Sequence, residues 1–214
     1  MTERQSGAAS CPNCGAPIRF RFVQAVQTTC DFCKSVLVRR GLDLEKVGTQ
    51  AEFPRTGSPI QLGTEGKWRG RNFTVVGRVT YAWQFGRWNE WHCMMTDGKS
   101  AWLSDAQLEY AMTAQIDTPE ELLAPNLINV GKTFTFAGIH FQAATITAAV
   151  YVGTEGDLPF TTDNRTENWF ADLQNSQGAL ATIDGSERPP LLYVGEYVSF
   201  ETLELKGLRE FDGW

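Results

Sequence analysis

The sequence lacks the features of a membrane-spanning or exported chain. No apolar run approaches the roughly 18 residues that a transmembrane helix needs. The first residues, Met1 to Gly7, contain no apolar segment of the kind that signal peptides carry. Hydrophobic residues make up 42% of the chain and charged residues 21%, so a core can be filled and general disorder is not expected. These features predict a folded, cytoplasmic protein.

Histidine is scarce, which limits the catalytic arrangements that the chain can form. Only His92 and His140 are present, and both fall in segments with the pattern of strands. A catalytic nucleophile needs a base oriented beside it. Cys93 follows His92 directly, but neighbours on a strand point to opposite faces. We therefore name no catalytic residue and favour a protein that is not an enzyme.

Cysteine is also scarce, yet four of the five cysteines follow one metal-binding pattern. Cys11 and Cys14 form one C-x₂-C pair, and Cys30 and Cys33 form another, with 15 residues between the pairs. This spacing is typical of zinc sites. Two tight turns can place four thiolates about 2.3 Å from one Zn²⁺ in a tetrahedron. Because the protein supplies all four ligands, the Zn²⁺ is predicted to be structural.

Residues 1–40 are predicted to form a zinc ribbon around this site. Alternating apolar residues at 18–22 indicate one strand, and Val36–Val38 indicate the returning strand. A unit this small cannot bury enough surface alone, and zinc binding can add roughly 10–16 kcal/mol of apparent folding energy. Residues 41–59 carry several Gly and Pro breakers and are predicted to be a connector.

Residues 60–214 are predicted to be a β-rich body with one short helix. The chain is 12% aromatic and holds 20 glycines, which favours strands and tight turns. Asp97-Gly98 lies between two apolar runs and is a strong hairpin signal. The short helix is expected to begin near Thr118, where a capping residue precedes Pro119.

The two halves of the body are similar to each other in sequence. The segment Gly70–Phe73 resembles Gly138–Phe141, and the Asp97-Gly98 turn has a counterpart at Gln177-Gly178. This predicts two related β-units, at 60–117 and 128–214, arranged as a sandwich or as two small barrels. The alternative is that strand-rich sequences repeat such patterns by chance.

Several blocks of the body carry a family resemblance, which covers most of the chain. The blocks are Ser58–Gly66, Gly70–Arg78, Trp88-Asn-Glu-Trp91, Ala101-Trp-Leu103 and Leu192-Tyr-Val-Gly195. In these blocks the chain resembles bacterial proteins of domain of unknown function 4178, in the form with an N-terminal zinc ribbon. The resemblance implies a β-rich, cytosolic bacterial protein and brings no activity or catalytic residues.

Charge and aromatic residues suggest three functions for the body. Residues 41–214 hold 13 basic and 23 acidic groups, so the body as a whole should repel nucleic acid. Basic and aromatic residues nevertheless interleave between Lys67 and Trp91, as in single-stranded nucleic-acid sites and in protein-binding hot spots. The third possibility is a pocket for a small ligand or an enzymatic site inside the body, which a deep cavity at Glu90, His92 or His140 would support.

The leading hypothesis is a non-enzymatic zinc-ribbon adaptor that binds a protein partner in the bacterial cytosol, with a membrane-associated assembly as one setting. Arg87, Trp88 and Glu90 are the candidate partner-binding residues, and Arg87 and Trp88 are expected in a loop between strands. The alternatives are a single-stranded nucleic-acid-binding module and a small-ligand-binding or enzymatic β-domain.

Overall fold

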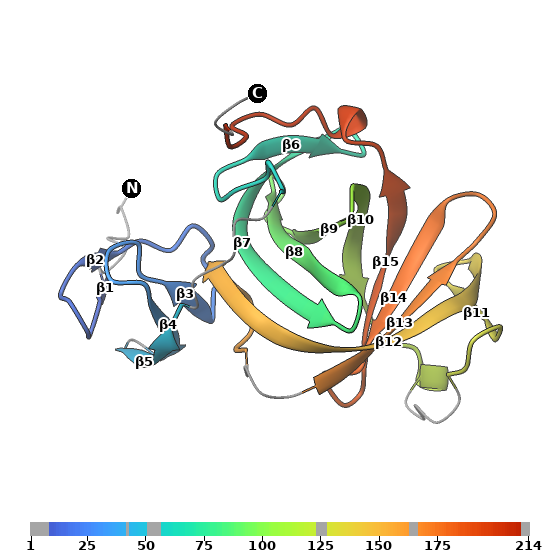
Figure 1. Cartoon of the computed structure of the whole chain (residues 1–214), viewed down its shortest axis with the longest axis horizontal. Helices are drawn as coiled ribbons and strands as arrows, with labels where there is room; N and C mark the ends of the chain where they lie inside the picture. The colour runs from blue at the N-terminus through green and yellow to red at the C-terminus, as the bar shows by residue number, and fades with distance from the viewer. Residues whose placement is uncertain (1–8, 42, 51–56, 123–127, 163–166, 211–214) are drawn as a thin grey trace, which may run out of the picture.

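The computed structural model of the chain describes residues 9–41, 43–50, 57–122, 128–162 and 167–210. This part of the chain forms strands and two short 3-10 turns and contains no α-helix. Two small sheets lie at the N-terminal end, and a ten-stranded antiparallel sheet forms the body (Figure 1). The mainly β fold class is thus confirmed. No helix in the described residues is long and apolar enough to cross a membrane.

The ribbon is built from two antiparallel sheets. One pairs β1 (Ala9–Ser10) with β2 (Pro17–Ile18), and the other contains β3 (Gln27–Thr29), β4 (Ser35–Arg40) and β5 (Asp43–Thr49). Two expectations are corrected here. The strand expected at 18–22 ends at Ile18, because the chain then turns toward the body. Part of the predicted connector is a strand, since β5 pairs with β4 along its length.

The body consists of two successive runs of five strands. Every neighbouring pair within a run is antiparallel. The first run comprises β6 (Glu65–Trp68), β7 (Arg71–Trp83), β8 (Gly86–Met95), β9 (Ser100–Ala106) and β10 (Glu109–Ile116). The second comprises β11 (Thr133–Phe136), β12 (Ile139–Gly156), β13 (Glu167–Gln174), β14 (Ala179–Asp184) and β15 (Leu191–Val198).

Two seams join these runs and close the sheet on itself. β10 pairs with β15, and β12 pairs with β7 in addition to its hairpin partners. The eight strands β7–β10 and β12–β15 therefore form a closed ring, while β6 and β11 extend it at the starts of β7 and β12. The two predicted units are thus halves of one continuous sheet, neither a sandwich nor two separate barrels.

The two runs have matching local structure. The turns Arg69-Gly70 and Ala137-Gly138 both have positive φ at both residues, as two-residue hairpin turns of the favoured type require. Both long strands carry a bulge at the same place, between Val75 and Gly77 in β7 and between Ala143 and Thr145 in β12. An extra residue reverses the faces to which later side chains point. Each long strand therefore contributes first to an apolar core and then to the interior of the ring.

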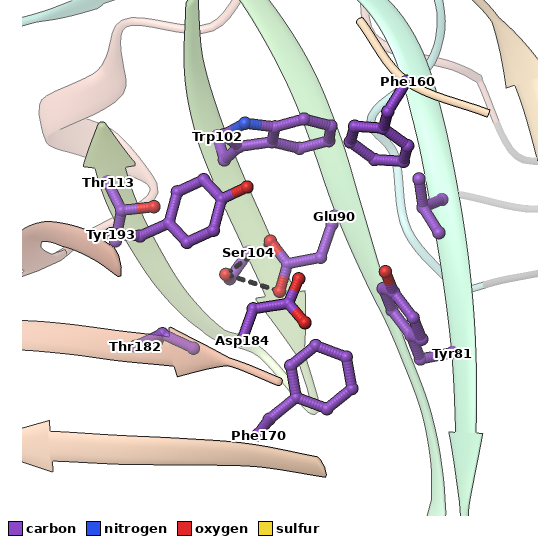
Figure 2. A pocket seen from close by; sticks show the side chains of 11 residues that line it. Tyr81, Glu90, Trp102, Ser104, Thr113, Phe160, Phe170, Thr182, Asp184 and Tyr193 are labelled. Atoms are coloured by element: carbon purple, nitrogen blue, oxygen red, sulfur yellow. Dashed lines mark hydrogen bonds between the residues drawn. The ribbon is translucent and has the colours of Figure 1, made fainter. Parts of the chain in front are cut away.

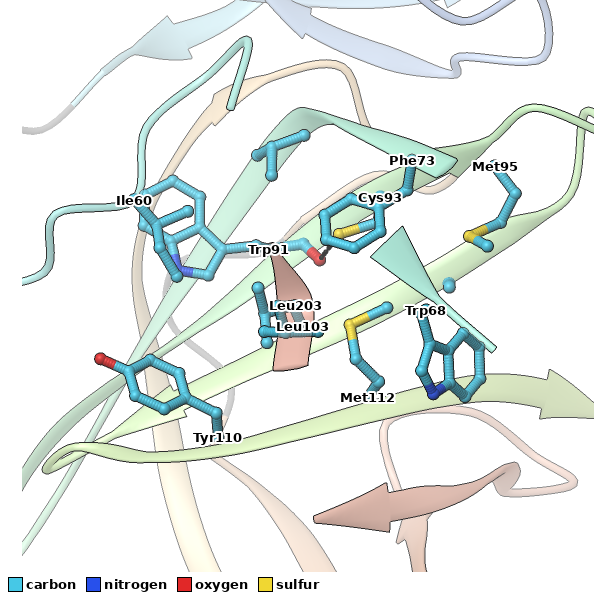
Figure 3. Close-up of a cluster of buried hydrophobic side chains, with 12 residues drawn as sticks. Ile60, Trp68, Phe73, Trp91, Cys93, Met95, Leu103, Tyr110, Met112 and Leu203 are labelled. Carbon is cyan, nitrogen blue, oxygen red and sulfur yellow. Dashed lines mark hydrogen bonds between the residues drawn. The ribbon is translucent and has the colours of Figure 1, made fainter. Parts of the chain in front are cut away.

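Two apolar cores lie on the outer face of the ring, one for each run. The first contains Trp68, Phe73 and Trp91 and is drawn in Figure 3. The second contains Phe136, Phe141 and Ile183. Their largest side chains are almost fully buried, so this burial supplies most of the hydrophobic stabilisation of the body.

The segments that follow the last strand of each run are exchanged between the cores. After β10 the chain forms the 3-10 turn η1 (Glu120–Leu122), and Leu122 packs into the second core. After β15 it forms η3 (Glu201–Leu203), and Leu203 packs into the first core. The predicted short helix is thus the single turn η1. The Thr118 hydroxyl does not cap this turn, since it donates to the Pro190 carbonyl at 2.7 Å.

Candidate functional site

The four cysteines of the ribbon lie within 4.8 Å of one another, measured between their sulfur atoms. The Cys11 and Cys33 sulfurs are 3.6 Å apart, and those of Cys14 and Cys30 are 3.8 Å apart. A tetrahedron with metal–sulfur bonds of about 2.3 Å has sulfur–sulfur edges of about 3.8 Å. The four side chains therefore fit a single metal ion, which they could hold without a further ligand.

Two equivalent turns position these cysteines. In the first, the Gly15 amide donates to the Cys11 carbonyl at 2.8 Å, and in the second, the Lys34 amide donates to the Cys30 carbonyl at 3.0 Å. Gly15 and Lys34 both have positive φ. The Ser35 hydroxyl lies 3.2 Å from the Cys33 sulfur. Together with Asn13, this hydrogen bond lowers the pKa of Cys33, whereas hydrogen bonds with the other three sulfurs raise the pKa of Cys14. One thiolate therefore forms readily at Cys33, and a metal ion would be needed to hold all four sulfurs in the thiolate form.

Asp157, just beyond the end of β12, fastens the ribbon to the ring. Its carboxylate accepts hydrogen bonds from the Arg21 amide at 2.5 Å, the Phe22 amide at 3.1 Å and the Thr28 hydroxyl at 2.6 Å. Asp157 has no exposed surface. A buried carboxylate that accepts several hydrogen bonds is a firm anchor, because removing it leaves those donors unpaired. The contact explains why the chain turns at 19–22.

His92 continues this contact into the ring. Its Nδ1 lies 3.0 Å from the Asp157 carbonyl oxygen and its Nε2 lies 2.9 Å from the Ser100 hydroxyl. Its ring stacks on Trp102, with centroids 5.0 Å apart. Burial lowers the pKa of His92 to about 4, so the ring is neutral near pH 7. His92 is thus a packed structural residue. The other histidine, His140, is exposed, and its Nδ1 lies 2.8 Å from the Thr135 hydroxyl.

The interior of the ring contains a cavity, which we describe as two adjoining hollows. The inner hollow has a volume of about 50 Å³ and the outer hollow about 320 Å³. They share the lining residues Glu90, Ser104, Phe170 and Thr182. Every strand of the ring contributes to the lining, through Tyr81, Glu90, Ser104, Thr113, Thr147, Phe170, Thr182 and Tyr193 in chain order.

The outer hollow connects the inner one with solvent. Its lining includes the exposed residues Arg87, Gln107 and Glu109 near the β7–β8 and β9–β10 turns. Its volume falls within the range of about 300–1,000 Å³ that is common for ligand pockets. A small molecule can therefore reach the interior from this end of the ring.

Glu90 lies where the two hollows meet. Its carboxylate accepts hydrogen bonds from the Ser104 hydroxyl at 2.8 and 2.9 Å and from the Trp88 indole at 3.0 Å. Burial raises the pKa of Glu90 to about 7, and the nearby carboxylates of Asp172 and Asp184 raise it further against the effect of Ser104. Glu90 can therefore change its charge near neutral pH.

Asp184 and Asp172 add two more carboxylates to the cavity. Asp184 lines the inner hollow and Asp172 the outer one. Burial raises the pKa of both groups. Figure 2 shows the carboxylates of Glu90 and Asp184 and the hydroxyls of Tyr81 and Tyr193 pointing toward the same space.

The three residues suggested for partner binding lie at this cavity. Arg87, Trp88 and Glu90 all belong to β8, so the expected loop is a strand. Trp88 stacks on Tyr81 with centroids 5.1 Å apart and meets Phe170 edge-on at 5.8 Å. Trp88 and Glu90 thus face the cavity, and only Arg87 is exposed.

The basic and aromatic residues between Lys67 and Trp91 do not form one surface. Trp68, Phe73 and Trp91 are buried in the first core. Arg78 is 2% exposed and forms an ion pair with Glu155 across the β7–β12 seam. The remaining paired cations are Lys67 with Glu204, Arg69 with Glu196 and Arg71 with Asp97. This arrangement does not favour a stacking platform for single-stranded nucleic acid.

Sequence reasoning missed Asp172, Asp184, Tyr81 and Tyr193 as site residues. Asp172 and Asp184 alternate with apolar residues of the second core, a pattern that ordinarily indicates a solvent-facing side of a sheet. The sequence does indicate one polar face for β13 and β14, because Asp172, Thr182 and Asp184 alternate with apolar residues. Whether this face lies in solvent or inside a cavity depends on the closure of the ring, which local patterns do not predict.

Comparison with known proteins places the chain in a family. Residues 61–200 match the model of the domain of unknown function DUF4178, and the chain belongs to this family. The match spans all ten strands of the body and leaves out the ribbon. No curated protein and no solved structure matches the chain.

The structure gives physical reasons for two of the blocks that carry the resemblance. In Trp88-Asn-Glu-Trp91, the alternation sends Trp88 and Glu90 into the cavity and Trp91 into the first core. In the block that ends at Gly195, a Cβ atom on this glycine would lie 1.8 Å from the Met112 carbonyl oxygen. The β10–β15 seam therefore needs glycine at that position.

Proposed function

We propose that the body is a binding domain for a small molecule, and that the ribbon is a zinc-stabilised module fastened to it. The observation that carries the proposal is the cavity enclosed by the eight strands of the ring. Cavities of this size with a few ionisable groups among aromatic walls are the usual form of ligand sites. Well-packed domains otherwise leave few voids larger than a water molecule.

Zinc is the metal that the ribbon chemistry favours. Four thiolates in tetrahedral arrangement suit Zn²⁺, and two equivalent hairpin turns are the usual frame for a structural zinc site. With all four positions supplied by cysteine, the metal would have no open site for a substrate. Its contribution would be to hold the ribbon in the shape that presents the Arg21 and Phe22 amides to Asp157.

Ligand-observed NMR on the purified protein tests the binding domain. A fragment set with cationic, neutral and anionic members is screened against the wild type and Thr147→Trp. Thr147 lines the outer hollow, and a tryptophan there would occupy much of its volume. Ser176→Trp, in the exposed turn between β13 and β14, is the matched control.

We expect fragments that bind the wild type and the Ser176→Trp control and lose binding in Thr147→Trp. If no fragment of any charge binds, or if the hits bind Thr147→Trp unchanged, the cavity is not a ligand site. Far-UV circular dichroism on both variants verifies that the sheet is intact.

Protein binding by the ribbon is a second candidate function, supported by two exposed apolar side chains. Val23 is 82% exposed and Phe32 is 71% exposed, and Phe32 lies within the second cysteine pair. Exposed aromatic residues on a rigid turn are typical of protein-binding sites. A pull-down with Phe32→Ser, compared with Val47→Ser on β5, tests this function; equal recovery of the same partner with both variants would contradict it.

A further inference from the structure

The inner hollow is strongly unbalanced in charge. Two of its lining residues, Glu90 and Asp184, are carboxylic acids, and Asp172 lies in the adjoining hollow. No lysine, arginine or histidine lines the inner hollow among the residues that the structure describes. Arg87 lines the outer hollow, but on its exposed side. The deep part of the cavity therefore has negative charge without a cation of its own.

The hydrogen bonds of these acids are all with neutral groups. Glu90 accepts from Ser104 and Trp88. Asp172 accepts from Thr182 at 2.9 Å, and Asp184 accepts from the Ser186 amide at 2.8 Å. Neutral donors do not remove the repulsion between carboxylates. An uncharged ligand, such as a sugar, would leave this repulsion in place, whereas a positively charged ligand would remove it.

The carboxylates of the cavity do not form a group of three that could surround a metal ion. Among the described residues, the four cysteines are the one group of three or more His, Cys, Asp and Glu side chains whose ligand atoms come close enough. At most two of the cavity carboxylates therefore meet at one point, whereas Ca²⁺ takes about 6–8 oxygen ligands. A molecular cation that also contacts the aromatic walls fits this arrangement better.

The walls of the inner hollow are aromatic. Trp102 stacks with Phe160 at a centroid distance of 5.7 Å, and Tyr81 meets Phe170 edge-on at 5.0 Å. Aromatic faces attract cations and also pack against apolar groups. The hydroxyl of Tyr81 points into the same space and has no hydrogen-bond partner among the described residues (Figure 2). An ammonium group can donate three hydrogen bonds, which the Tyr81 hydroxyl and the carboxylates of Glu90 and Asp184 can accept.

We propose that the cavity binds a small organic cation, with a primary ammonium group held between Glu90 and Asp184 and an apolar part packed against Trp102, Phe160 and Phe170. The assignment rests on the proposed function and names the chemical class of its ligand. The excess of acidic groups in the body would also raise the local concentration of cations near the entrance.

Three probes of nearly equal shape separate charge from shape. Benzylammonium, benzyl alcohol and benzoate are titrated into the full-length protein, and binding is followed by isothermal titration calorimetry at pH 8 and low salt. We expect benzylammonium to bind at least about tenfold more tightly than benzyl alcohol, because a charge-assisted hydrogen bond replaces a neutral one. Benzoate should not bind measurably.

Two variants then locate the charge. Glu90→Gln and Asp184→Asn should each weaken benzylammonium binding by about 10- to 100-fold and leave benzyl alcohol binding nearly unchanged. Glu120→Gln removes an exposed carboxylate outside the cavity and should change neither. Because the comparison of the three probes uses the wild type alone, it stands even if a variant fails to fold.

The proposal is overturned if benzyl alcohol or benzoate binds as tightly as benzylammonium, if benzylammonium does not bind, or if both variants bind it like the wild type. These outcomes can be told apart from failure of the binding domain itself. Suppose that neutral or anionic fragments bind the wild type and do not bind Thr147→Trp. The cavity would then still be a ligand site, and only its assignment to cationic ligands would be refuted.

Discussion

Replacing Glu90 with glutamine should stabilise the protein, and more so at alkaline pH. The pKa of this carboxyl is raised from 4.5 to about 7, mainly by burial. The folded protein therefore holds the proton more tightly than the unfolded chain does. Between these two values the folded state binds more protons, so stability falls as pH rises and levels off above pH 7. The amide of glutamine does not ionise and can still accept from Ser104 and Trp88.

The size of the effect follows from the two pKa values. With one pKa unit worth 1.36 kcal/mol, the ionisation of Glu90 lowers the free energy of unfolding by about 2 kcal/mol at pH 6 and about 3 kcal/mol at pH 8. Water in the cavity screens part of this charge, so these values are upper estimates. The advantage of Glu90→Gln over the wild type should thus grow by about 1 kcal/mol between the two pH values.

Urea denaturation of both proteins at pH 6, 7 and 8 measures this difference. Taking the difference between variant and wild type removes the contribution of the metal site, which both proteins share, and leaves that of Glu90 together with its coupling to Asp172 and Asp184. Equal m-values would show that the variant unfolds from the same compact state. A difference that does not change with pH, or a variant that is less stable at pH 8, would refute the assignment of a raised pKa to Glu90.

Three further changes test the metal site, a seam and a core. Cys30→Ser should lose the bound metal and the protease resistance of the ribbon, whereas Cys93→Ser should keep both; equal metal content by mass spectrometry would exclude Cys30 as a ligand. Gly77→Ala places a Cβ atom 2.1 Å from the Asp157 carbonyl oxygen and should cost about 3 kcal/mol in urea denaturation; a neutral effect would mean that the seam can shift. Leu203→Ala should cost about 2–5 kcal/mol, and a smaller loss in the same assay would show that the first core does not depend on η3.

Local patterns in the sequence predict the metal site and most strands. The spacing of Cys11, Cys14, Cys30 and Cys33 predicts a tetrahedral metal site directly, because each pair of cysteines lies in one tight turn. The Asp97-Gly98 turn likewise predicts a hairpin whose two strands are adjacent in the chain, as β8 and β9 are. Such features depend on a few neighbouring residues, so they can be recognised without the fold.

The closure of the ring could not be predicted in this way. The β7–β12 and β10–β15 seams join residues that lie far apart in the chain, and nothing in either strand specifies the distant partner. Without the closure, the polar face of β13 and β14 is assigned to solvent. In the structure the polar face is the interior, and the apolar faces lie outside under the η1 and η3 segments. The sequence therefore leaves Glu90 open as a partner contact or a cavity residue, and the closed ring places it in the lining of the cavity.

The exchange of Leu122 and Leu203 between the two cores has a consequence for biosynthesis. A growing chain that has emerged only as far as β10 already contains Trp68, Phe73 and Trp91, but it lacks the leucine that covers them. That leucine follows the whole second run in the chain, together with Leu205 and Leu208, which pack against the same core. The first half must therefore wait, with its aromatic residues accessible to chaperones, until the second half has been synthesised.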